Sequence, residues 1–77
     1  MVRSPNQTLG TAVRALREER GISREVFAVN AGLTTGTLAR LELGRSDPSW
    51  STIRAIANAL GMTAAEFIAT AEAEERG

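Results

Sequence analysis

SREVFAVNAGLTTGTLARLEL, residues 23–43, is the stretch of this sequence that decides the fold. It predicts two short helices joined by a tight turn at Gly32, because glycine tolerates the positive φ that a chain often needs on leaving a helix. Ala28, four residues earlier, leaves room for the helices to cross. The second helix carries an apolar seam at helical spacing, formed by Leu33, Leu38 and Leu41.

The remaining sequence predicts three further helices and no strand. Apolar segments end at regularly placed glycines, as helices often do, namely Gly21, Gly32, Gly44 and Gly61. No run alternates apolar and polar residues as a strand would. We expect an all-α fold with five helices, at about 8–20, 23–30, 34–43, 49–60 and from 63 onward. Pro48 disfavours helix at the residue before it, so residues 44–48 form a loop.

The same periodicity predicts the core and the organisation of the chain. The side chains expected to face inward are Leu9, Val13, Leu16, Phe27, Ala28, Trp50, Ile53, Ile56, Ala57, Leu60 and Phe67. Large aromatics dominate burial in small cores, although Trp50 and Phe67 could instead lie partly exposed in a dimer contact. Val26 and Val29 fall on the outer side of their helix. We expect an arm at residues 1–7, the domain at 8–70 and a fraying acidic tail at 71–77.

Composition describes one small domain of 77 residues, of which 43% are apolar and 23% charged. A core this small makes dimerisation a plausible source of stability. No apolar run approaches the roughly 20 residues of a membrane span. The N-terminus has no signal-peptide core, so we expect a cytoplasmic protein.

An enzyme is disfavoured by the residue types that are missing. Without histidine or cysteine, the chain cannot build a Ser–His or Cys–His nucleophilic pair or a disulfide. Metal sites lose their two best nitrogen and sulfur ligands. Neither Gly-x-Gly-x-x-Gly nor a Walker A loop is present. We therefore expect no catalytic residue, no metal and no cofactor.

The charge is unevenly distributed along the chain. The formal net charge is zero, which counts against nucleic-acid binding. Residues 1–65, however, hold eight Arg against five acidic residues, whereas residues 66–77 hold four Glu against one Arg. The acidic surplus lies at the C-terminal end, away from residues 23–43, so the charge permits DNA binding without demanding it.

We interpret residues 23–43 as a helix-turn-helix formed by the second and third helices, whose second member can enter the major groove of DNA. Over residues 8–69 the chain also resembles the Cro/C1-type (XRE) helix-turn-helix domains of lambdoid phage repressors and bacterial regulators. The matching residues are Leu16, Arg17, Arg20, Gly21, Ile22, Ser23, Phe27, Ala28, Ala31, Gly32, Leu33, Thr34, Leu38, Leu41, Glu42, Gly44, Arg45, Pro48, Ile56, Ala57, Ala59, Leu60 and Gly61. The resemblance implies a compact five-helix bundle that usually binds operator DNA as a dimer, with its fifth helix and chain end as the dimer contact.

Base recognition is expected from the start of the third helix. Thr35, Gly36 and Arg40 point away from the Leu38 and Leu41 side, and Thr37 lies near its edge. Threonine can hydrogen-bond a base and touch the thymine methyl, and arginine can contact both O6 and N7 of guanine. By resemblance these four residues occupy base-reading positions. The alternative is a solvated helix face.

Gly36 has no side chain with which to read a base, and glycine inside a helix costs about 1 kcal/mol relative to alanine. Two interpretations stay open. Either the backbone approaches DNA closely at this residue, or the contact is missing and specificity is weaker.

Phosphate contacts are expected around the ends of the helix-turn-helix. Free N–H groups at the start of the second helix, after Ser23, can hold a phosphate, and Arg24 stands beside them. By resemblance, Arg45 and Ser46, just past the third helix, match positions that commonly contact the DNA backbone. The full set of candidates is Ser23, Arg24, Thr34, Arg45, Ser46 and Arg14, with Arg3 weaker. The alternative for each arginine is an unpaired surface side chain.

Arg17 and Glu42 are expected to be structural. By resemblance they form a partly buried ion pair that links the first and third helices, and an unpaired buried charge would be costly.

The leading hypothesis is a sequence-specific regulator, a repressor that binds double-stranded DNA as a homodimer at an inverted repeat. A second hypothesis is an antitoxin-like interaction module whose acidic end, after Glu66, binds a basic partner protein. A third keeps the fold without specific recognition.

Overall fold

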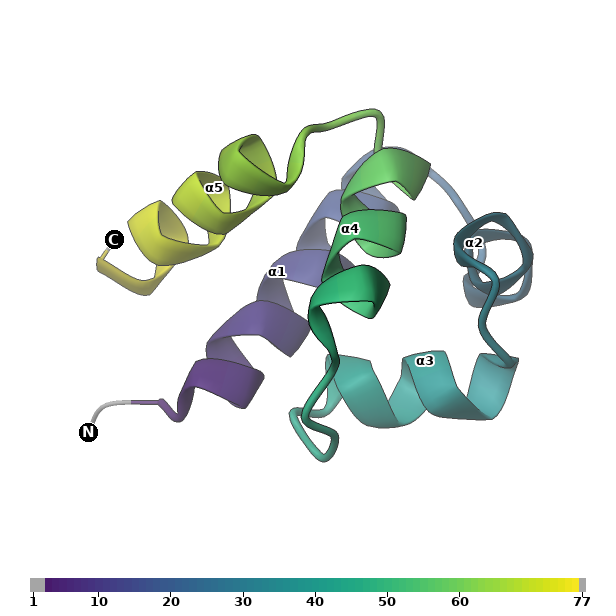
Figure 1. The fold of residues 1–77 in the computed structure, drawn as a ribbon, viewed down its shortest axis with the longest axis horizontal. Coiled ribbons are helices and arrows are strands. Elements are labelled where there is room, and N and C mark those ends of the chain that lie inside the picture. The colour runs from purple at the N-terminus through teal and green to yellow at the C-terminus, as the bar shows by residue number, and fades with distance from the viewer. Residues whose placement is uncertain (1–2, 77) are drawn as a thin grey trace.

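The computed structural model describes residues 3–76; Met1, Val2 and Gly77, parts of the expected arm and tail, lie outside the described residues. Five helices make up this part of the chain, and it contains no strand (Figure 1). The helices are α1 (Pro5–Glu19), α2 (Arg24–Ala31), α3 (Thr35–Glu42), α4 (Trp50–Ala59) and α5 (Ala64–Arg76). The predicted all-α class is therefore confirmed.

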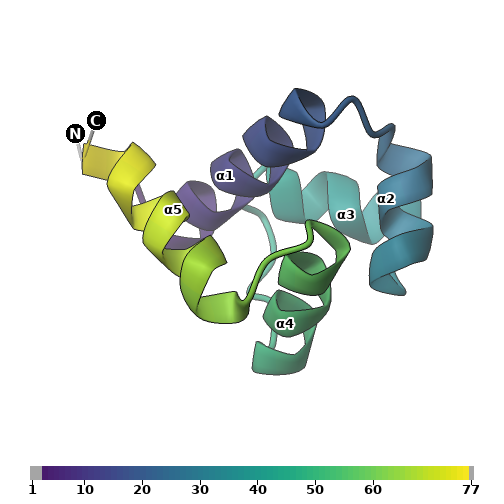
Figure 2. The ribbon, with the colours of Figure 1, turned by 90° about the horizontal axis from the view of Figure 1, so that it is seen from above.

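The helices are arranged so that α3 lies at an edge of the molecule. α1 packs against both α3 and α5, while α2 packs against α3 and α4. Figure 1 shows α3 along the lower edge, with no other helix beyond it. Figure 2 shows α1 and α5 side by side, with the start of α1 next to the end of α5. The outer face of α3 is thus left open.

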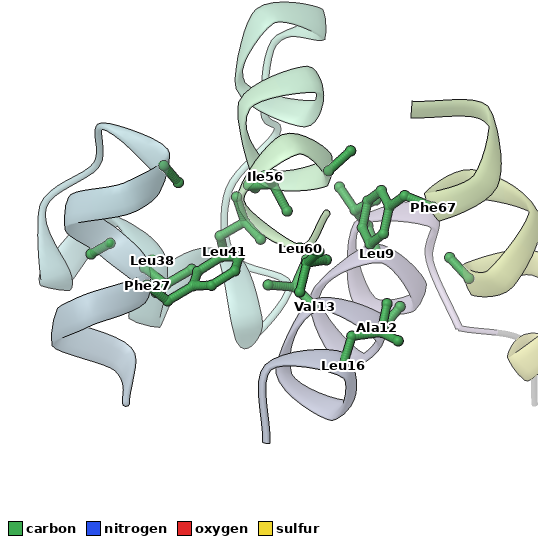
Figure 3. Close-up of a cluster of buried hydrophobic side chains, with 14 residues drawn as sticks. Leu9, Ala12, Val13, Leu16, Phe27, Leu38, Leu41, Ile56, Leu60 and Phe67 are labelled. Atoms are coloured by element: carbon green, nitrogen blue, oxygen red, sulfur yellow. The ribbon is translucent and has the colours of Figure 1, made fainter. Parts of the chain in front are cut away.

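The core is assembled from all five helices. Figure 3 shows Phe27 of α2 beside Leu38 and Leu41 of α3, and Phe67 of α5 beside Leu9 of α1. The largest fully buried side chains are Phe27, Phe67, Leu38, Leu41, Ile56 and Val13. The predicted burial of Phe67 and the predicted exposure of Val26 and Val29 are confirmed.

Trp50 corrects the predicted core, because 61% of this residue is exposed. The buried residues of α4 are Ile56 and Ala57, in the second half of the helix. Trp50 is the first residue of α4, and the first turn of this helix holds no buried residue. The helical period was therefore right, but burial does not reach the beginning of the helix.

The start of α1 is also corrected. Ser4, rather than a residue near Thr8, caps this helix, and Pro5 occupies its first position. The Ser4 Oγ accepts a hydrogen bond of 3.2 Å from the Gln7 N–H, while the Gln7 Oε1 accepts one of 3.0 Å from the Ser4 N–H. This reciprocal capping box, followed by a proline that needs no N–H partner, favours an earlier helix start.

The acidic end of the chain, expected as a tail after Thr70, is helical as far as Arg76 and belongs to α5. Ala71 is buried against the core, and the Thr8 hydroxyl donates a hydrogen bond to the Glu75 carboxylate. The predicted capping box at the start of α5 is confirmed, because Thr63 and Glu66 exchange hydrogen bonds of 2.8 and 3.1 Å. The burial of Ala71 and the Thr8–Glu75 hydrogen bond therefore hold the C-terminal half of α5 against the rest of the fold.

Candidate nucleic-acid interface

The turn between α2 and α3 is fixed by backbone hydrogen bonds. Gly32 adopts the left-handed conformation, with φ of 70° and ψ of 30°. This lets the Leu33 N–H donate to the Ala28 carbonyl oxygen at 2.8 Å. Thr34 then caps α3, because its Oγ1 accepts a hydrogen bond of 3.1 Å from the Thr37 N–H. The direction of α3 relative to α2 is therefore set within three residues.

α3 is anchored by one face and open on the other. Leu38 and Leu41 are buried on the inner face. Thr35, Gly36 and Arg40 are exposed on the outer face, and Thr37 is half-buried at its edge. The structure thus brings together on one surface the four residues predicted to read bases. Their contact with DNA stays a prediction.

Two of the threonine hydroxyls are engaged with each other. The Thr34 hydroxyl donates to the Thr37 Oγ1 at 2.8 Å. The side chains of Thr35 and Arg40 have no hydrogen-bond partner among residues 3–76. Arg40 and Thr35 are therefore the polar side chains of this surface that are free to bind a partner.

Glu42, the last residue of α3, binds the side chains of two arginines. The Arg17 guanidinium donates two hydrogen bonds to the Glu42 carboxylate, of 2.8 and 3.2 Å, and a third of 2.9 Å to the Ile22 carbonyl oxygen. The side chains of Arg17 and Glu42 are only 8% and 1% exposed. Arg24 adds a 3.3 Å contact to the same carboxylate. The predicted ion pair is present, and Arg24 extends it.

Hydrogen bonding to Glu42 raises the pKa of Arg17 above its ordinary value, against the opposing effect of burial. A raised pKa means that the folded state favours the charged form of Arg17. Its contribution to stability is therefore present at every pH below the ordinary arginine pKa and is lost only as the pH rises through the raised value.

The candidate phosphate residues have different environments. The Ser23 Oγ caps α2 by accepting from the Val26 N–H at 3.2 Å. Arg45 is exposed just past α3. The Ser46 Oγ is shielded from solvent and has no hydrogen-bond partner within the described part of the chain, so it would have to rotate to reach a phosphate. Arg14 is exposed and paired with Glu18 at 3.2 Å.

Some residues that shape this surface have no signal in the sequence pattern. Gly10 lies where α1 crosses α3, and a Cβ there would stand 2.2 Å from the Leu41 carbonyl oxygen. The exposed apolar residues Leu43 and Trp50 flank the α3–α4 loop. These features depend on how the helices pack in three dimensions, so the sequence pattern gives no signal for them.

The described residues 3–76 contain no group of three or more acidic residues, histidines or cysteines placed to hold a metal ion. Within the same residues, no helix is long and apolar enough to span a membrane.

Five helices with an exposed third helix, positioned by a glycine turn and a buried ion pair, define a helix-turn-helix domain. The family model described as "Helix-turn-helix domain" matches residues 8–67. The chain belongs to this family, and the resemblance to Cro/C1-type domains is confirmed. Proteins of this family and fold are transcriptional regulators that bind DNA, and they are not enzymes.

Comparison with individual proteins agrees with this classification. The immunity repressor protein of Bacillus phage phi105 is 36% identical over 61 residues, which cover 79% of this chain and 42% of that protein. The chain thus spans less than half the length of that repressor, and 22% of a Mycobacterium tuberculosis regulator that it also matches.

Solved structures extend the similarity to the whole fold. The clp gene regulator ClgR from Corynebacterium glutamicum has a TM-score of 0.90 at 25% identity, covering 99% of this chain and 81% of that one. The restriction-modification controller protein C.AhdI from Aeromonas hydrophila has a TM-score of 0.77 at 29% identity, covering 80% of this chain and 94% of that one.

Proposed function

We propose that this protein binds double-stranded DNA sequence-specifically, with α3 in the major groove. The observation that carries the proposal is the open outer face of α3, where Thr35 and Arg40 project with no partner among the described residues. In this docking geometry, residues at the N-terminal part of the second helix reach base edges. Arg40 would contact a guanine and Thr35 a neighbouring base, with Thr37 at the edge of the contact.

Phosphate contacts would come from the ends of the two helices. Ser23, Arg24 and Thr34 lie at helix starts, whereas Arg45 and Ser46 follow α3; Arg14 is more peripheral. Arg24 is bound to Glu42 in the free protein, but its side chain is still 39% exposed. Glu42 already orients the Arg24 guanidinium. A phosphate beside it would therefore share this guanidinium with Glu42 or compete with Glu42 for it.

The finer proposal is a repressor that acts as a homodimer on an inverted-repeat operator. A two-fold pair of domains reads half-sites about one helical turn, roughly 34 Å, apart. Exposed Trp50 supports dimerisation, because tryptophan side chains that become buried when two proteins associate often contribute most of the binding energy. The phage repressor among the relatives supports repression. Such a regulator would act in the cytoplasm, where bacterial DNA lies.

The experiment that tests DNA binding is a titration of fluorescently labelled random duplex with the purified protein over a range of salt concentrations. We expect affinity to fall steeply as salt rises, because each neutralised phosphate releases bound counterions. Binding that is absent at low salt, from protein shown to be folded by circular dichroism, would overturn the proposal.

A second candidate function is protein binding by the acidic end of the chain, as in an antitoxin-like module. A groove of about 320 Å³ lies between the start of α1, the α3–α4 loop, α4 and α5. Apolar residues such as Leu9, Ile53 and Ile68 line it, with carboxylates of Asp47, Glu72 and Glu75 among them. This combination favours an apolar segment that carries basic residues.

Truncation after Ala69 would remove the buried Ala71 and the Glu75 contact, so charge reversal is the sharper test of this candidate. If the product of a neighbouring gene binds this groove, Glu72→Lys weakens the complex. Glu74→Lys, on the same helix but outside the groove, leaves it unchanged. Equal effects of the two variants would contradict docking in the groove.

A further inference from the structure

Gly36 is a glycine that the fold does not require. Four of the other described glycines have positive φ, namely Gly21, Gly32, Gly44 and Gly61. Gly10 is required by packing, because a Cβ there would stand 2.2 Å from the Leu41 carbonyl oxygen. At Gly36 φ is not positive, and an added Cβ would have no heavy atom within 4 Å.

Alanine would therefore fit at Gly36 and would favour the helix. Gly36 is the second residue of α3, and glycine loses more backbone entropy on folding than alanine, at a cost of up to about 1 kcal/mol within a helix. Within residues 3–76, no neighbouring atom requires a glycine at this position. The reason for a glycine here is therefore to be sought outside the protein.

The position of Gly36 indicates where that partner would lie. Gly36 and Arg40 are four residues apart on α3, so they are neighbours on the same helix face. Both are exposed on the outer surface of α3. A duplex that Arg40 contacts through a base edge would bring the adjacent base pair against the Gly36 Cα.

We propose that Gly36 is a specificity-determining residue that accommodates the C5 methyl group of a thymine in the major groove. The inference rests on the proposed docking of α3. Glycine has no side chain for hydrogen bonding, so it can discriminate between base pairs only by the space it leaves. The thymine methyl is the apolar group that projects from a base into this groove. The Cβ of any larger residue would occupy its place.

The test combines removal of the base methyl with addition of a protein methyl. On an operator duplex obtained by selection, each thymine is replaced singly by deoxyuridine, and affinities of the wild type and Gly36→Ala are measured. At one position the wild type should lose about fourfold in affinity, the amount expected for one buried methyl-sized group. Gly36→Ala should bind the thymine duplex at least tenfold more weakly than wild type, and should recover most of that loss on deoxyuridine.

Two controls separate this effect from unfolding and from failure of DNA binding. Gly36→Ala should melt at or above the wild-type temperature, and Asn58→Ala, exposed on α4, should bind both duplexes like wild type. Equal wild-type affinity on all deoxyuridine duplexes, or a Gly36→Ala loss that no deoxyuridine relieves, would overturn the thymine contact alone. A wild type for which selection finds no operator would overturn the proposed function, and this inference with it.

Discussion

Arg17 of α1 and Glu42 of α3 are joined by two hydrogen bonds of 2.8 and 3.2 Å, in a pair almost closed to solvent. The pair fixes the C-terminal end of α3 to the helix on which it packs. Because α3 is only eight residues long, its position depends on such tertiary contacts more than on its own helix propensity. Stability and the geometry of the proposed DNA surface are therefore coupled through this contact.

Arg17→Ala should destabilise the fold by about 3–5 kcal/mol, because it leaves the Glu42 carboxylate buried and short of a partner. The matched control is Arg14→Ala, which removes an exposed pair with Glu18 on the same helix and should cost less than about 1 kcal/mol. Urea denaturation measures the free energy of unfolding of both variants and of the wild type. A melting temperature of Arg17→Ala equal to that of the wild type would contradict the structural role.

The two helical glycines should respond in opposite directions to alanine. Gly10→Ala forces a methyl group against the Leu41 carbonyl oxygen and should destabilise by at least about 1–3 kcal/mol. Gly36→Ala meets open space and should stabilise by up to about 1 kcal/mol. Thermal unfolding followed by circular dichroism compares them. A destabilised Gly36→Ala would mean that the fold does need this glycine.

Arg40→Ala should relax specificity at one base pair of the operator, at a cost of about 1–3 kcal/mol in binding. Because the Arg40 side chain is exposed and has no hydrogen-bond or ion-pair partner among residues 3–76, stability should change by less than about 0.5 kcal/mol. Competition with single-base operator variants provides the measurement. Arg54→Ala, on α4 outside the helix-turn-helix, is the control. Uniform weakening across all base variants would assign Arg40 to the phosphates instead.

Arg24→Gln should reduce the salt dependence of DNA binding if Arg24 contacts a phosphate. Loss of one phosphate contact lowers the slope of log affinity against log salt by about 0.9. Glu42 keeps its bonds to Arg17, so the fold should persist. Affinity measured at four or more salt concentrations gives the slope. An unchanged slope would assign Arg24 solely to the ion pair with Glu42.

Trp50 provides a direct signal of dimerisation, because it is the single tryptophan of the chain and is exposed. If it lies in the dimer contact, its emission should shift to shorter wavelength as protein concentration rises through the dimer dissociation constant. Sedimentation on the same samples gives the oligomeric state. Dimers whose emission stays constant would show that the contact lies elsewhere, as on α5.

The sequence predicted most of the fold because its signals are local. The caps of α2, α3, α4 and α5, and the glycines that end the first four helices, are features of a few neighbouring residues. The Ser4 capping box is local too, but the expected arm overlaps it, because no apolar residue marks the first turn of α1. Tertiary packing decided the rest, namely that Trp50 lies beyond the core and that Ala71 lies within it.

The sequence predicts which residues share the candidate face, but not the contacts that each of them makes. Helical spacing correctly grouped Thr35, Gly36 and Arg40 on the open side of α3. It could not reveal that Arg24 shares Glu42 with Arg17, because that contact joins residues 18 apart in sequence on different helices. Nor could it separate Gly10 from Gly36, since the difference lies in what each glycine faces.

The central claim is that the open face of α3 reads DNA sequence, and selection from a pool of randomised duplexes tests it most directly. The purified protein is incubated with the pool at moderate salt, and the bound fraction is sequenced over several rounds. We predict enrichment of an inverted repeat with half-sites about one helical turn apart, and loss of preference at one position per half-site for Arg40→Ala. A folded protein that enriches no sequence would contradict the claim.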